Sequence, residues 1–191
     1  MDSLALIVLV VIAVLAIAMY NMYVSVIMAK NKVKEAFSSI DVQLKKRYDL
    51  IPNILTIASK FMEHERGLLE EITKLRAQAL EIPKDLSQTD KKFALDKEIS
   101  SKLGQIMVAV ENYPQLKSDQ TMVTAMQTYN EVEEHISAAR RFYNSAVNDL
   151  NNKVEIFPSS IFASMCNIKT QPFFETDEAS RHSINASEYL K

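Results

Sequence analysis

The hydrophobic pattern divides the chain into a continuous apolar run near its N-terminal end and a periodic remainder. Residues 3–29 contain no charged residue, and Leu4 to Met19 is apolar without interruption. A helix that crosses the hydrocarbon core of a bilayer needs about 20 mostly apolar residues. The sequence therefore predicts one transmembrane helix near Leu4 to Val24. The charge-free run continues past a sequence that resembles a signal-peptide cleavage site, which favours an uncleaved anchor.

Apolar residues after this run recur every three or four positions, which is the spacing of one face of a helix. The membrane helix is expected to continue to about Tyr48, and a second helix to run to about Leu80. Because Pro52 lacks a backbone donor and disfavours helix at the preceding residue, Asp49 could cap that second helix. One kinked, continuous helix through Pro52 is the alternative.

A third helix is expected from about Asp90 to Asn112, with Pro114 ending it. The buried faces of the three helices follow from the same spacing. They comprise Val33, Ala36, Phe37, Ile40 and Leu44; then Ile54, Ala58, Phe61, Leu68, Ile72, Leu75 and Ala79; then Leu95, Ile99, Leu103, Ile106, Val110 and Tyr113.

A fourth helix, ended by Pro158, has the clearest pattern. Its apolar residues alternate spacings of three and four, which is typical of helical bundles and coiled coils. It is longer than the third helix by about a dozen residues, or roughly 18 Å. Part of this apolar seam should therefore need cover from the C-terminal segment or from a second subunit. The seam comprises Met122, Ala125, Tyr129, Val132, Ile136, Ala139, Tyr143, Ala146, Leu150 and Phe157.

The predicted fold is all-α: an N-terminal transmembrane helix followed by an antiparallel long-helix bundle of coiled-coil type with about four helices. Only two glycines occur in the chain, whereas sheets and tight hairpins depend on glycine turns. We expect a transmembrane anchor at 1–29, a helical bundle at 30–158 and a C-terminal segment at 159–191. That segment should dock through Phe162, Phe173 and Phe174, and disorder is expected from about Thr176.

Histidine and cysteine residues are present, but they lack the spacing of known metal-binding or catalytic motifs. His64 and His135 have no glutamate three residues before them, and His64 has no second histidine four residues later, so zincin and di-iron patterns fail. Cys166 is the only cysteine, and no glycine-rich phosphate loop or nucleophile motif is present. The net charge of −2 gives no indication of nucleic-acid binding. We therefore expect no metal, no cofactor and no enzymatic activity.

Two groups of charged residues are candidates for interaction. Lys45, Lys46 and Arg47 could bind anionic lipid headgroups, but a straight helix would hold them about 25–30 Å above the membrane interface, beyond the reach of electrostatic attraction. A solvated charged face is the simpler reading. The second group flanks the seam residue Tyr143 and could form a structural polar network with acidic residues of earlier helices, or a partner-binding surface. It comprises Arg140, Arg141 and Asn144, with Asp41 and Asp49 as the acidic partners.

Taken together, these segments resemble the LemA family of bacterial membrane proteins. The matching stretches are Ile40 to Arg47, Asp49 to Asn53, His64-Glu65, Tyr113 to Lys117, Arg140 to Asn144 and Phe157 to Ser159. The resemblance implies a single-span protein of the bacterial inner membrane with an antiparallel helical bundle, and it implies no activity and no catalytic residues. One departure is Asn167, which stands where relatives usually carry glycine.

The lysines after the span, Lys30, Lys32 and Lys34, predict an outside N-terminus and a cytoplasmic bundle. The leading hypothesis for function is a membrane-anchored scaffold or adaptor that acts by self-association or by docking another membrane protein. The expected partners are thus the lipid bilayer and either a second copy or another membrane protein, with no nucleic acid. A bundle that binds a lipid, a metal or a small molecule is the alternative, and an enzyme is the third possibility.

Overall fold

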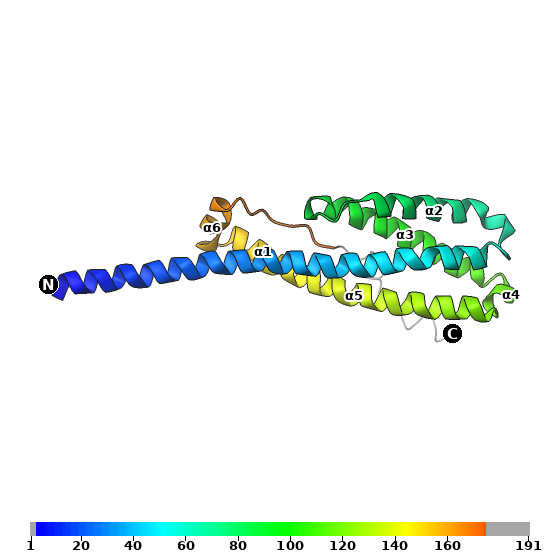
Figure 1. Ribbon diagram of the computed structural model, residues 1–191, viewed down its shortest axis with the longest axis horizontal. Helices are drawn as coiled ribbons and strands as arrows, with labels where there is room; N and C mark the ends of the chain where they lie inside the picture. Colours follow the sequence, from blue (N-terminus) through cyan, green and yellow to red (C-terminus); the bar gives the residue numbers. More distant parts are fainter. Residues whose placement is uncertain (1–2, 175–191) are drawn as a thin grey trace, which may run out of the picture. The chain divides into compact units, whose positions relative to one another are not determined.

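The computed structural model describes residues 3–174, and within that range it contains helices and turns but no strand. The expected all-α fold is confirmed, with a long apolar helix at the N-terminal end (Figure 1). The elements in order are α1 (Ser3–Ala58), η1 (Glu63–Glu65), α2 (Arg66–Glu81), η2 (Leu86–Gln88), α3 (Thr89–Val110), α4 (Pro114–Lys117), α5 (Gln120–Glu155) and α6 (Ser159–Met165).

The chain forms two compact units, and α1 and α5 each contribute to both. The first unit contains residues 1–47 and 130–172. Of the described residues, the second contains 48–129 and 173–174. The expected disorder from Thr176 and the third histidine, His182, lie outside the described residues.

In the first unit, α1 and α5 run antiparallel. Three contacts fix their register. From one contact to the next, the position on α1 advances along the chain while the partner on α5 moves back. The contacts are Ser25 with Lys153, Phe37 with Tyr143, and Arg47 with Glu133. Nearly the same number of residues separates the contacts on both helices, so the two helices stay in register over the whole stretch.

The predicted seam of α5 is buried where α5 belongs to the first unit. Its residues from Val132 to Leu150 are at most 8% exposed. The five predicted core residues of α1 between Val33 and Leu44 are buried as well. From Val132 to Leu150 the seam is therefore covered within one chain, and this stretch needs no second subunit. Phe157 does not rejoin the seam, because α5 has ended and its side chain is 75% exposed.

In the second unit, the predicted helix break at Pro52 is wrong, and the continuous alternative is correct. α1 passes through Pro52 and ends at Ala58. The chain then turns through η1, and α2 begins at Arg66. The predicted α2 core residues Ile72, Leu75 and Ala79 are buried, but Leu69 is buried in place of the predicted Leu68, which is half-buried. α2 ends before Ile82, whose extended backbone suits a residue that precedes proline.

α2 and α3 form an antiparallel pair in the second unit, and Lys102 of α3 contacts Glu71 of α2 at 2.7 Å. Four of the predicted α3 core residues, from Ile99 to Val110, are buried. Leu95 is only half-buried, and its neighbours Phe93 and Asp96 are buried instead. The prediction missed Asp96 because a carboxylate is rarely buried without a partner.

A turn at Asn167 closes α6 in the first unit. The N–H of Ile168 donates to the carbonyl of Ala163, and the N–H of Asn167 donates to that of Ser164. This pattern requires a left-handed residue after the helix, usually glycine and sometimes asparagine. Asn167 adopts a φ of 50° and supplies that conformation. Asparagine at this position therefore preserves the turn.

Candidate functional site

The apolar end of α1 has the length and composition of a membrane span. An 18-residue window of this helix has a mean hydropathy of 2.9, and none of the window is buried by the rest of the chain. Among residues 3–174, α1 is the one helix that meets this description. Burial on α1 begins at Val26. The apolar segment thus projects from the packed part of the first unit.

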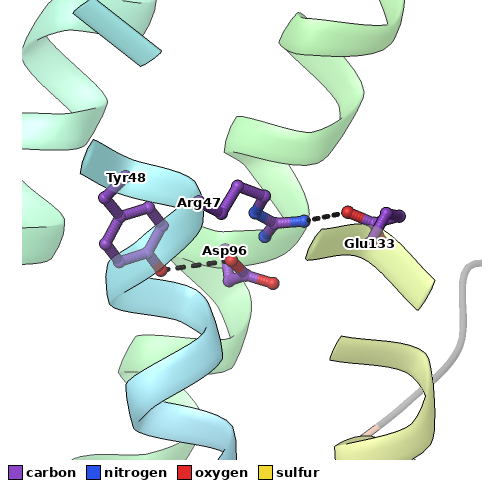
Figure 2. A network of polar contacts seen from close by, with 4 residues as sticks. All are labelled: Arg47, Tyr48, Asp96 and Glu133. Atoms are coloured by element: carbon purple, nitrogen blue, oxygen red, sulfur yellow. Dashed lines mark hydrogen bonds and ion pairs between the residues drawn. The ribbon is translucent and has the colours of Figure 1, made fainter. Parts of the chain in front are cut away.

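The basic cluster after the span is divided by the helix. Lys45 and Lys46 are exposed, whereas Arg47 is completely buried. Arg47 shares a face with Ile40 and Leu44, seven and three residues earlier, so it points into the core. Its Nη1 donates to the carboxylate of Glu133 on α5 at 2.8 Å (Figure 2). Arg47 therefore joins α1 to α5 and does not face solvent with the two lysines.

The next residue of α1 makes a buried polar contact in the second unit. The Tyr48 hydroxyl donates to the carboxylate of Asp96 at 3.1 Å (Figure 2). Arg76 of α2 reaches the same turn of α1, where its Nε donates to the Tyr48 carbonyl at 2.6 Å. Its Nη2 lies 4.0 Å from the carboxylate of Asp49. Asp49 thus has a cation of α2 beside it, which the sequence did not indicate.

The predicted polar group on α5 lies partly inside the first unit. Arg140 and Asn144 are half-buried, and Asp41 of α1 is half-buried as well. All three take part in interactions with other residues. The register of α1 and α5 places Asp41 level with the turn that carries Arg140, which agrees with a structural polar network. Arg141 is exposed, and its Nη1 donates to Ser137 one turn earlier at 3.0 Å.

An open groove runs along α1 and α5 in the first unit, with a volume of about 620 Å³. Its large apolar and charged lining residues are Met28, Lys32, Glu35, Phe142, Asp149 and Lys153. Met28 is 65% exposed and Phe142 is 42% exposed. The sequence analysis missed both, although their signal was present: each is a large apolar residue that lies off the buried face of its helix.

Metal ligands do not gather in the described part of the chain. No group of three or more His, Cys, Asp or Glu residues there is placed to hold an ion. His64 lies exposed in η1, and His135 lies exposed on α5. Cys166 is a free, partly buried thiol at the end of α6.

Comparison with known proteins assigns the family. A family model described as the LemA family matches residues 36–187. The chain belongs to the LemA family. A protein named LemA from Metamycoplasma hominis is 24% identical over 159 residues, which cover 83% of this chain and 71% of that protein. Family membership and the apolar helix together identify this LemA-family chain as a membrane-anchored protein.

Two further relatives come from Paramagnetospirillum magneticum and are named magnetosome proteins MamQ 1 and MamQ 2. Each is 22% identical over 164 residues, covering 74% of this chain. The matches span 60% of the length of the MamQ proteins. The LemA-family chain therefore corresponds to a part of these longer relatives.

Proposed function

We propose that this LemA-family protein is a non-enzymatic, membrane-anchored scaffold or adaptor that binds a helix of a second protein beside its own anchor. The groove along α1 and α5 carries this proposal. It begins at Asn21 and Val24, at the end of the apolar span, and continues to Glu35 and Phe142. A helix that leaves the bilayer next to α1 would enter the groove directly.

The chemistry of the groove suits an amphipathic helix. Met28 and Phe142 offer exposed apolar surface for one ridge of such a helix. The groove is also lined by charges of both signs, from Lys32, Glu35 and Asp149. These charges suit the polar positions that flank the apolar ridge of an amphipathic helix.

The continuity of α1 strengthens this proposal. α1 extends without a break from the apolar span into the groove. A partner anchored in the same membrane would be confined close to it, and this confinement raises the effective concentration of a weakly binding helix. The occupant is a second copy of this chain or another membrane protein.

We place the anchor in the bacterial inner membrane, with the N-terminus outside and the bundle in the cytoplasm. Lys30, Lys32 and Lys34 follow the span closely, and basic residues at that position remain on the cytoplasmic side. Separate C-terminal fusions to alkaline phosphatase and to a fluorescent protein test this orientation. A bright fluorescent fusion with an inactive phosphatase is expected, and the opposite pair of results would reverse the assignment.

Photocrosslinking tests the groove. A photoreactive amino acid replaces Phe142 in the full-length protein, and a matched variant carries it at Val108 of α3, which is 69% exposed and outside the groove. Irradiation of intact membranes should give a discrete protein adduct from position 142 and none from position 108. Met28→Glu should abolish the adduct because it places a charge in the apolar floor.

The mass of the adduct distinguishes a second copy from a different membrane protein. Absence of a protein adduct at position 142, or an adduct that Met28→Glu leaves unchanged, would contradict the scaffold proposal. A crosslink to a lipid or another small molecule alone would favour the ligand-binding alternative.

A further inference from the structure

The end of α5 and the short helix α6 expose an unusual amount of apolar surface. The side chains of Ile156, Phe157, Ile161 and Met165 are between 50% and 77% exposed. The twelve residues from Ile156 to Asn167 include no charged residue. Contiguous exposed apolar surface on a folded chain commonly marks a contact with another protein or with a membrane.

The antiparallel register places this surface beside the membrane span. Lys153 Nζ donates to the Ser25 carbonyl at 3.3 Å. Continuing the register by one turn brings Ile156 and Phe157 level with Met22 and Asn21 of α1. Partial burial on α1 agrees with this placement: Ala18 and Met22 are half-buried, while the other described residues up to Tyr23 are exposed.

α6 lies at the end of the packed part of the first unit, where the apolar span of α1 projects from it (Figure 1). It begins directly at the end of α5, since the Ser160 N–H donates to the Ile156 carbonyl at 3.0 Å. After the turn at Asn167, the chain runs back along α5. Gln171 exchanges two hydrogen bonds with Asn151, at 2.9 and 3.0 Å, and the Tyr143 hydroxyl donates to the Pro172 carbonyl. The reversal leaves α6 at the level where the span ends.

The two faces of α6 differ in their surroundings. Ala163 faces the unit and is buried, and so is Ile168, which follows the turn at the end of the helix. Ile161 and Met165, four residues apart, lie on one helical face and are exposed. An apolar outer face at the depth of the interface suits insertion among lipid headgroups and upper acyl chains.

We propose that α6 and the residues that join it to α5 form a second bilayer contact, in which Ile156, Phe157, Ile161 and Met165 insert into the interfacial region of the membrane that α1 crosses. This surface is termed the apolar cap. Its occupant is lipid because it continues the apolar span laterally, at the level of Tyr20 and Tyr23, where interfacial aromatic residues are expected. The contact would hold the first unit against the bilayer and limit its tilt about the single anchor.

Spin labels in the full-length protein test the apolar cap. Cys166→Ala provides a background without native thiols, because Cys166 is the only cysteine. Single cysteines then replace Ile161, Met165 or Val108, the last as an exposed control on α3. The labelled proteins are reconstituted into vesicles of phosphatidylcholine and phosphatidylglycerol, and the accessibility of each label to oxygen and to a water-soluble nickel chelate is measured.

Labels at positions 161 and 165 should show an oxygen-to-nickel accessibility ratio several-fold above that at position 108, since oxygen concentrates in lipid and nickel remains in water. A ratio equal to that at position 108 would overturn the proposal. Shielding from both oxygen and nickel would also overturn it, because a second protein surface would then cover the cap. Circular dichroism of each labelled protein checks that its helix content is unchanged.

Discussion

The Nε of Arg76 donates to the carbonyl of Tyr48 at 2.6 Å, and this is the carbonyl that Pro52 leaves without its helical donor. In an α-helix the N–H of each residue bonds to the carbonyl four residues earlier. Pro52 has no N–H, so α1 lacks that bond at Tyr48. A side chain of α2 supplies the replacement, which explains how α1 continues to Ala58 where the sequence predicted a break.

Removing Arg76 should therefore destabilise the protein, and the loss should depend on Pro52. Arg76→Met is expected to lower the free energy of unfolding by about 1–3 kcal/mol, because it leaves the Tyr48 carbonyl without a partner. In a Pro52→Ala background the helix regains its own donor, so the same substitution should cost clearly less. The free energy of unfolding is measured by urea titration of the full-length protein in mild detergent, with circular dichroism as the signal. The four proteins compared are the unchanged protein, Arg76→Met, Pro52→Ala and the double variant.

Arg66→Met serves as the control for this cycle, because Arg66 is an exposed arginine on the same helix. It should leave the stability unchanged in both backgrounds. An equal cost of Arg76→Met with and without Pro52 would show that the two residues do not act on the same carbonyl.

Arg47 and Lys46 are adjacent basic residues that should respond oppositely to the same substitution. Arg47→Ala removes a completely buried side chain and its 2.8 Å contact with Glu133, which should cost about 1–3 kcal/mol because the Glu133 carboxylate is partly exposed and can be solvated. Lys46→Ala changes an exposed side chain and should have no measurable effect on the unfolding midpoint. Similar results for both variants would mean that Arg47 belongs to the solvated face.

The seam of α5 should behave as core within a single chain. Ile136→Ala and Leu150→Ala are each expected to cost about 2–5 kcal/mol, because both side chains are almost completely buried. Val108→Ala on the exposed face of α3 is the control. The loss should not vary with protein concentration, since α1 covers the seam in the same chain. A loss that disappears on dilution would instead place the seam between subunits.

Asn167 should tolerate glycine and reject a branched side chain. Its φ of 50° lies in the left-handed region, where glycine has no steric cost. Asn167→Gly is expected to leave the thermal midpoint unchanged or slightly raised. Asn167→Val should destabilise the turn by about 1–2 kcal/mol, with increased proteolysis after α6 as the local readout. Equal midpoints for the two variants would argue against this turn.

Periodicity predicted the parts of this fold that depend on local pattern. The seam from Val132 to Leu150 and the α1 core from Val33 to Leu44 are buried as expected, because one amphipathic face defines each of them. The span of α1 likewise follows from an uncharged apolar run. These features require no knowledge of which helix packs against which.

The errors occur where a residue from a distant segment decides the outcome. Pro52 indicates a break when it is considered alone, and only the position of Arg76 shows why none occurs. In the sequence, Arg47 belongs to a basic run. The carboxylate that pairs with its buried guanidinium comes from Glu133, which lies on another helix. The apolar residues Met28 and Phe142 form one groove only because the register of α1 and α5 brings them to the same side.

The mass of the full-length protein, extracted from native membranes in a gentle detergent, tests the scaffold account most directly. The account predicts a complex heavier than one chain with its detergent, and a smaller species for Phe142→Glu, which places a charge in the groove between α1 and α5. Val108→Glu, outside the groove, should leave the mass of the complex unchanged. A strictly monomeric native protein with no co-purifying partner, or a complex that persists unchanged in Phe142→Glu, would contradict it.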